Sequence, residues 1–216
     1  MSILTIILIV LMSVALCLYC RAAASGRYYA YIILGYLSLL LVTTLVGAYL
    51  ILVVHVRNDL FLFHIYTPLE YTLLALLYSK ALSNRMAKRV AGWSIPLFAG
   101  LSVLFSLYLQ KTEDNNSLMT MIESLLLILW SLIYLLEVLL LQQVQRLQVY
   151  PLFWISVGIL FYFAGSFTLE GLLNYMMRKD MALAQRVYRY GYIVKYLYLV
   201  LLMIGGVCLI REPRKS

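Results

Sequence analysis

Hydrophobic segments of about 20 residues follow one another along the whole chain, separated by short polar stretches. An α-helix rises about 1.5 Å per residue, so a segment of this length crosses the roughly 30 Å hydrocarbon core of a bilayer. A helix also pairs its own backbone donors and acceptors, for which lipid offers no hydrogen-bond partners. The pattern therefore predicts an all-α integral membrane protein that folds as a single bundle of transmembrane helices.

The composition supports the same class of protein. Of the 216 residues, 64% are hydrophobic and 12% are charged, whereas a soluble domain is about half apolar and a quarter charged. No stretch between the apolar segments is long enough to form a soluble domain, which excludes a kinase, a nuclease or a DNA-binding head. We therefore expect the lipid bilayer as a partner and no nucleic acid, although the net charge is +8.

Seven spans are predicted in one domain that covers residues 1–216, with no soluble domain. Polar stretches such as VRND, SNRMAKR and KTEDNNS separate them. The connection RKDMALAQRVYRY is basic and aromatic, which suits an interfacial helix or an early extension of the seventh span. The predicted spans are residues 3–20, 28–54, 60–82, 90–109, 118–141, 152–177 and 191–210.

The distribution of lysine and arginine predicts the orientation. The loops on one side carry Arg21, Arg27, Lys80, Arg85, Lys88, Arg89, Arg146, Arg211, Arg214 and Lys215. The loops on the other side carry fewer, namely Arg57, Lys111, Arg178, Lys179, Arg186 and Arg189. Since basic loops tend to stay in the cytoplasm, we expect the N-terminus outside and the C-terminus in the cytoplasm. The predicted location is a bacterial-type inner (plasma) membrane.

The stretch FHIYTPLEYTLL in the third span carries residues that are costly in hydrocarbon. His64 lies ~6 Å and Glu70 ~15 Å below the outer end of this span. Pro68 cannot donate to the carbonyl of His64, so we predict a helix kink at Pro68. Polar residues of this helix form two neighbouring stripes, one with His64, Thr67 and Tyr71 and the other with Tyr66 and Glu70.

Polar residues of three other spans fall at a similar depth. Glu170 and Asn174 share one face of the sixth span at i and i+4. An unpaired carboxylate at this depth costs several kcal/mol or must be protonated, and such groups usually mark functional sites. The predicted ligand-binding residues are therefore His64, Glu70, Glu123, Glu170, Asn174 and Lys195.

Structural interpretations of some of these residues stay open. Lys195 and Glu123 lie close enough to the outer interface for their charged ends to reach headgroup water. His64 can serve as a hydrogen bond between helices. If Lys195 points inward instead, it is the nearest cationic partner for the carboxylates.

No sequence motif indicates a metal, a cofactor or a catalytic group. The chain has two histidines and three cysteines, and it lacks the nucleotide-binding, zinc-binding and nucleophile patterns. Cys17, Cys20 and Cys208 are an odd number placed toward the cytoplasmic side, which favours free thiols. The cofactors and any catalytic residues stay unknown.

Three classes of function fit this sequence. The first is a receptor-like or transport-like bundle whose outward-facing polar pocket binds a small molecule or an ion. The second is a non-catalytic membrane subunit of a larger complex, whose polar residues only hold helices together. The third is an intramembrane enzyme acting on a lipid or prenyl substrate. We favour the first because intramembrane carboxylates usually serve binding or transport, and a receptor of this kind signals through a membrane protein partner.

Overall fold

The computed structural model describes residues 3–55, 61–108, 117–140, 147–177 and 181–211, without the side chains of 106–108, 117, 173–177, 181–186 and 188. Every element in these ranges is helical, as the sequence predicts. The α-helices are α1 (Ile3–Ala23), α2 (Tyr28–Leu52), α3 (Phe61–Ala81), α4 (Arg85–Tyr108), α5 (Ser117–Leu140), α6 (Pro151–Met177) and α7 (Met181–Arg211). A short 3-10 helix, η1 (Leu147–Val149), precedes α6.

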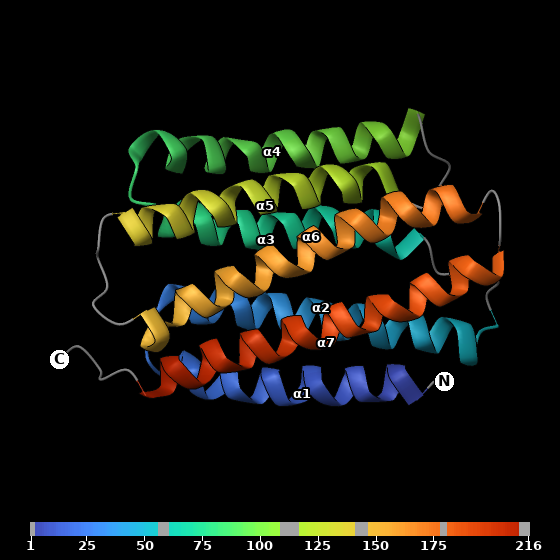
Figure 1. The fold of residues 1–216 in the computed structure, drawn as a ribbon, viewed down its shortest axis with the longest axis horizontal. Helices are drawn as coiled ribbons and strands as arrows, with labels where there is room; N and C mark the ends of the chain where they lie inside the picture. The colour runs from blue at the N-terminus through green and yellow to red at the C-terminus, as the bar shows by residue number, and fades with distance from the viewer. Residues whose placement is uncertain (1–2, 56–60, 109–116, 141–146, 178–180, 212–216) are drawn as a thin grey trace.

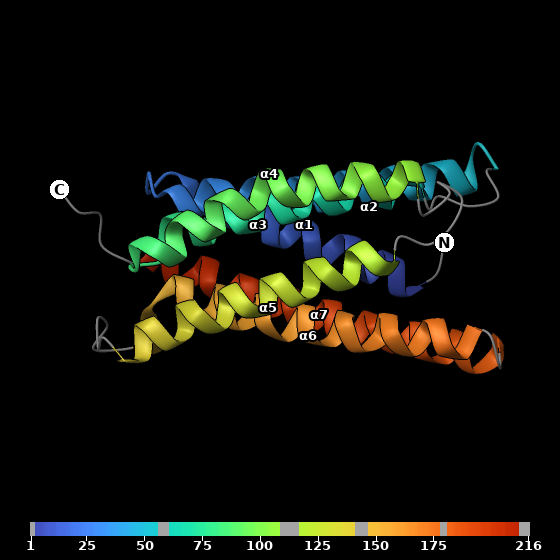
Figure 2. The same cartoon turned by 90° about the horizontal axis from the view of Figure 1, so that it is seen from above.

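The seven helices run side by side along one long axis (Figure 1). Six of them form a closed ring, in which α1 packs on α2 and α7, α3 joins α2 to α5, and α6 joins α5 to α7. Helix α4 lies outside the ring and packs mainly on α3. Seen from above, α5, α6 and α7 form one layer and α2, α3 and α4 another (Figure 2). Helix α1 begins at one end of the bundle, here called the N-terminal end, and α7 ends at the other, the C-terminal end (Figure 1).

Five of these helices are long and apolar enough to cross a membrane. They are the segments Ile3–Ala23, Tyr28–Leu52, Leu118–Leu140, Pro151–Leu172 and Arg189–Arg211. The remaining two, α3 and α4, are of similar length but are more polar. The surface also fits a lipid environment, since large apolar side chains such as Trp93 are exposed while Glu70 and Glu123 are buried. The prediction of an all-α membrane protein is confirmed to this extent.

Two helices, α4 and α7, begin several residues before the predicted spans. Helix α7 begins at Met181 and not at Gly191, so the predicted extension of the seventh span is correct. Residues 181–190 contain no glycine or proline that would stop a helix. Helix α4 begins at Arg85 because the Asn84 Oδ1 accepts a hydrogen bond of 2.8 Å from the amide of Met86, as an N-cap does. The predicted span ends Leu60, Leu109 and Leu141 lie outside the described residues.

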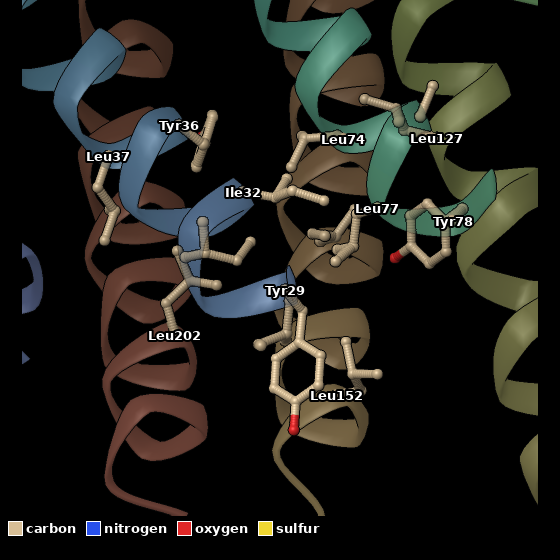
Figure 3. Packing of buried hydrophobic residues seen from close by; sticks show 14 of the residues in the cluster. Tyr29, Ile32, Tyr36, Leu37, Leu74, Leu77, Tyr78, Leu127, Leu152 and Leu202 are labelled. Carbon is tan, nitrogen blue, oxygen red and sulfur yellow. The ribbon is translucent and has the colours of Figure 1, made fainter. Parts of the chain in front are cut away.

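The C-terminal half of the bundle is closely packed. Buried apolar side chains form one cluster that extends through the bundle, and Figure 3 shows Ile32 of α2 with Leu74 and Leu77 of α3 pointing into the space between the helices. The Tyr19 hydroxyl donates a hydrogen bond of 3.0 Å to the carbonyl of Leu202, which links α1 to α7. Close to this bond, Gly205 lets α7 approach α6, as small residues do in membrane bundles.

We predict that Gly205→Ala destabilises the bundle. The added methyl group would lie 2.9 Å from Cγ1 of Ile155 and 3.2 Å from the carbonyl oxygen of Pro151, which is too close for an ordinary contact. Overpacking of this kind lowers the free energy of unfolding by about 1–3 kcal/mol. The matched control is Gly100→Ala, which meets nothing within 4 Å. Thermal unfolding in detergent should show a lower Tm for the first variant only, and equal Tm values would contradict the close packing of α6 and α7.

Candidate functional site

A cavity of about 150 Å³ lies between α3, α5, α6 and α7 in the N-terminal half of the bundle. We call it the acidic cavity because three carboxyl groups line it. Its charged members come from four helices, Glu70 from α3, Glu123 from α5, Glu170 from α6 and Lys195 from α7. Its other polar lining residues are Tyr66, Thr67, Thr120, Tyr162 and Ser166.

Helix α3 supplies one wall of the acidic cavity through a single helical stripe. Phe63, Tyr66, Thr67 and Glu70 all line the cavity, and their spacing of i, i+3, i+4 and i+7 places them on one face. Thr67 thus lines the cavity with Tyr66 and Glu70, although the predicted stripes grouped it with His64 and Tyr71, which do not line it. The Tyr71 hydroxyl donates a hydrogen bond of 2.6 Å to Ser94 Oγ and so joins α3 to α4.

Glu70 lies at the inner limit of the acidic cavity and is almost fully buried, with 4% of its surface exposed. The Tyr36 hydroxyl of α2 donates a hydrogen bond of 3.0 Å to its Oε1. The Tyr66 hydroxyl also approaches this carboxyl group, but without the geometry of a hydrogen bond. Hydrogen bonds from neutral donors offset only part of the cost of burying a carboxylate, so Glu70 still favours a positive charge nearby.

Glu123 is even more deeply buried, with 1% of its surface exposed. Its Oε1 has no hydrogen-bond partner among the described residues, and Glu70 lies close enough for the two carboxyl groups to interact electrostatically. Two ionised carboxylates that are close enough to interact repel each other unless a cation or a proton lies between them. Glu170, on the opposite wall, is partly exposed.

Lys195 points into the bundle. It lines the acidic cavity and also a second cavity described below, as the inward interpretation expects. Its Nζ lies 6.0 Å from the centroid of the Tyr192 ring, which suits a weak cation–π contact. Its charge also acts on Glu70 through space. Lys195 is therefore the one cationic residue that lines the acidic cavity in the part of the chain that the structure describes.

Tyr66 and Tyr162 line the acidic cavity, and further tyrosines pack behind Tyr162. The rings of Tyr162 and Tyr198 stack with centroids 4.6 Å apart, and Tyr36 lies against Tyr198 at 6.1 Å. The sequence analysis did not select these tyrosines. Four tyrosines surround Glu70, namely Tyr36, Tyr66, Tyr162 and Tyr198. Only Tyr66 could be expected there from the sequence, since it shares a helical stripe with Glu70. The contact of Tyr36 with α3 depends on how α2 packs.

A second cavity, of about 450 Å³, adjoins the first between α1, α2, α3 and α7. We call it the apolar cavity because most of its lining surface is apolar. Its apolar members include Leu8, Met12, Leu40, Ala48, Ile51, Leu52 and Leu62. The two cavities share the lining residues Phe63, Tyr66, Tyr162 and Lys195, so they meet around Lys195.

The structure does not bring every predicted residue to the acidic cavity. His64 is buried, but it does not line the cavity. Pro68 lies within the continuous helix α3, and the predicted kink there stays a prediction. Asn174 lies in α6, but its side chain is outside the described residues.

The described residues offer no preformed metal centre. No group of three histidine, cysteine, aspartate or glutamate side chains among them could hold a metal ion. All three cysteines are free thiols, and Cys17 and Cys20 lie on the exposed face of α1. The acidic cavity presents carboxyl groups, tyrosine and other hydroxyls and the ammonium group of Lys195.

We predict that the hydrogen bond from Tyr36 depends on a charge at Glu70. Tyr36→Phe should lower the free energy of unfolding by about 1.5–3 kcal/mol if the acceptor is charged. In a Glu70→Gln background the same change should cost only about 0.5–1.5 kcal/mol. Tyr78→Phe is the matched control, because its hydroxyl pairs with Ser131 at 2.9 Å and should cost the same in both backgrounds. An unchanged cost for Tyr36→Phe would show that Glu70 is neutral in the folded protein.

Comparisons with known proteins add no assignment to this geometry. No protein family model, no curated protein and no solved structure matches the chain with significance. The function of the acidic cavity has therefore to be inferred from its own residues.

Proposed function

We propose that this protein binds a small molecule or an ion in the acidic cavity and acts as a receptor or a transporter in a membrane. The observation that supports this function best is the convergence of three carboxyl groups and one ammonium group from four helices on one cavity. Intramembrane ionisable groups that face a bundle interior commonly mark ligand or ion pathways.

The charge balance favours a cationic ligand. If all four groups are ionised, the carboxylates of Glu70, Glu123 and Glu170 outnumber the single ammonium of Lys195. Burying like charges together is costly, and a bound cation or proton would relieve that cost. A ligand with a protonated amine, an inorganic cation or a transferred proton would each meet this requirement.

The proposed topology has seven spans, with the N-terminus outside and the C-terminus in the cytoplasm. Helices α3 and α4 complete the seven, because each runs the length of the bundle beside the five more apolar helices (Figure 1). Since both cavities lie toward the N-terminal end of the bundle, this orientation would open the site to the outer side of a bacterial-type inner membrane.

We expect Glu70→Gln and Glu170→Gln to fold but to lose cation binding. Each keeps the size of the side chain and removes one negative charge from the cavity. Thermal shift and calorimetric titration of the purified protein with sodium, potassium, ethanolamine and choline would measure the loss. The matched control is Glu137→Gln, because Glu137 lies far from the cavity, where it accepts a bond of 2.6 Å from the amide of Ser83.

Two outcomes of these titrations would count against the proposed function. If both cavity variants bind every probe as the unchanged protein does, the carboxylates only hold helices together, and a non-catalytic membrane subunit becomes the better description. If Glu137→Gln weakens binding as much as the cavity variants do, the loss reflects general destabilisation.

The proposed orientation can be measured independently. A fluorescent protein that matures only in the cytoplasm should fluoresce when it is fused after Ser216. In a variant with Cys17, Cys20 and Cys208 replaced by serine, a new cysteine in the loop KTEDNNS should react with a membrane-impermeant maleimide added outside intact cells. Protection of that cysteine in intact cells and reaction only after lysis would reverse the orientation.

A further inference from the structure

The apolar cavity adjoins the acidic cavity but has a different chemistry. Most of its lining surface is apolar, and each of its three threonines has a hydrogen-bond partner within the protein. The Thr5 hydroxyl pairs with the Tyr192 hydroxyl of α7 at 3.3 Å. Thr43 donates to the carbonyl of Leu39 at 2.9 Å, and Thr44 donates to the carbonyl of Leu40 at 2.8 Å. Away from Lys195 and the tyrosines that it shares with the acidic cavity, this cavity therefore offers a ligand mainly hydrocarbon, which suits an alkyl or acyl chain.

The order of chemical groups across the two cavities is specific. A path that begins among the aliphatic side chains of α1 and α2 reaches the ammonium of Lys195 where the cavities meet, and then the carboxyl groups of Glu70, Glu123 and Glu170. A ligand complementary to this order has a hydrocarbon chain, then an anionic group, then a cationic group. The two cavities together reach the size of small-molecule sites, roughly 300–1,000 Å³.

We propose that the ligand is a zwitterionic amphiphile with one hydrocarbon chain in the apolar cavity, a phosphate at Lys195 and an amine in the acidic cavity. This inference rests on the proposed function of the acidic cavity and names the class of its ligand. The amine would be held by the carboxyl groups, which outnumber the cations there. The phosphate would accept hydrogen bonds from the Lys195 ammonium, and the neighbouring hydroxyls of Tyr66 and Tyr162 are further donors at the same place.

Three probes test the inference. One carries all three features, and each of the other two lacks one of them. Lysophosphatidylethanolamine carries the chain, the phosphate and the amine. Lysophosphatidylglycerol lacks the amine, and glycerophosphoethanolamine lacks the chain. Native mass spectrometry of the full-length protein in detergent, supported by thermal-shift titration, should show tighter binding of lysophosphatidylethanolamine than of either incomplete probe.

Two variants on one helix separate the chain from the head group. Ala48→Phe fills the apolar cavity and should weaken lysophosphatidylethanolamine about tenfold, since excluding two buried methylene groups accounts for such a factor. The same variant should leave glycerophosphoethanolamine binding unchanged. Val42→Phe is the matched control, because Val42 lies on the exposed face of α2 and should change neither affinity.

The outcomes distinguish this inference from the proposed function. If Glu70→Gln weakens ethanolamine binding but Ala48→Phe has no effect on lysophosphatidylethanolamine, the amphiphile inference is wrong and the proposed function stands. Equal binding of lysophosphatidylglycerol and lysophosphatidylethanolamine would also overturn the inference, since the amine would then contribute nothing. If Glu70→Gln affects none of the probes, the proposed function itself fails.

Discussion

The burial of Glu70 is the interaction around which the N-terminal half of the bundle is organised. A carboxyl group inside an apolar bundle must find partners within the protein, because lipid offers none. Tyr36 of α2 donates to it, Glu123 of α5 lies close by, and Lys195 of α7 acts on it through space. One side chain of α3 is thereby coupled to three other helices, and the tyrosines Tyr162 and Tyr198 fill the space between them.

The two halves of the bundle solve different packing problems. In the C-terminal half, glycine and aliphatic side chains allow the helices to approach closely, as at Gly205 against Ile155. In the N-terminal half, α6 and α7 also approach closely at Gly165 against Val194, but polar side chains there line two adjoining cavities. Close packing at one end would hold the ring together while the other end accommodates a ligand. This division explains how a bundle of this size can combine stability with an open interior.

Much of the architecture follows from the sequence because it depends on local chemistry. The length and apolarity of each segment predict helices, and most predicted ends fall within a few residues of the observed ones. The misplaced starts of α4 and α7 have a simple cause. The predicted spans follow the apolar segments, which mark the part of a helix that lies in lipid. A helix can continue beyond that part, and polar turns such as those after Asn84 and Met181 extend α4 and α7 beyond the predicted spans.

The sequence by itself determined which residues are out of place in a membrane helix, since the cost of a buried carboxyl group at Glu70, Glu123 or Glu170 does not depend on the fold. It also determined the two stripes of α3, because helical periodicity is a local property. Only the tertiary structure decided which residues line the cavity, and it placed Thr67 there with Tyr66 and Glu70 and apart from its predicted neighbours His64 and Tyr71. It likewise decided that Lys195 points inward and that Tyr36 meets Glu70. These relations depend on how each helix is rotated about its axis against its neighbours, and that rotation is set by packing between residues far apart in the chain.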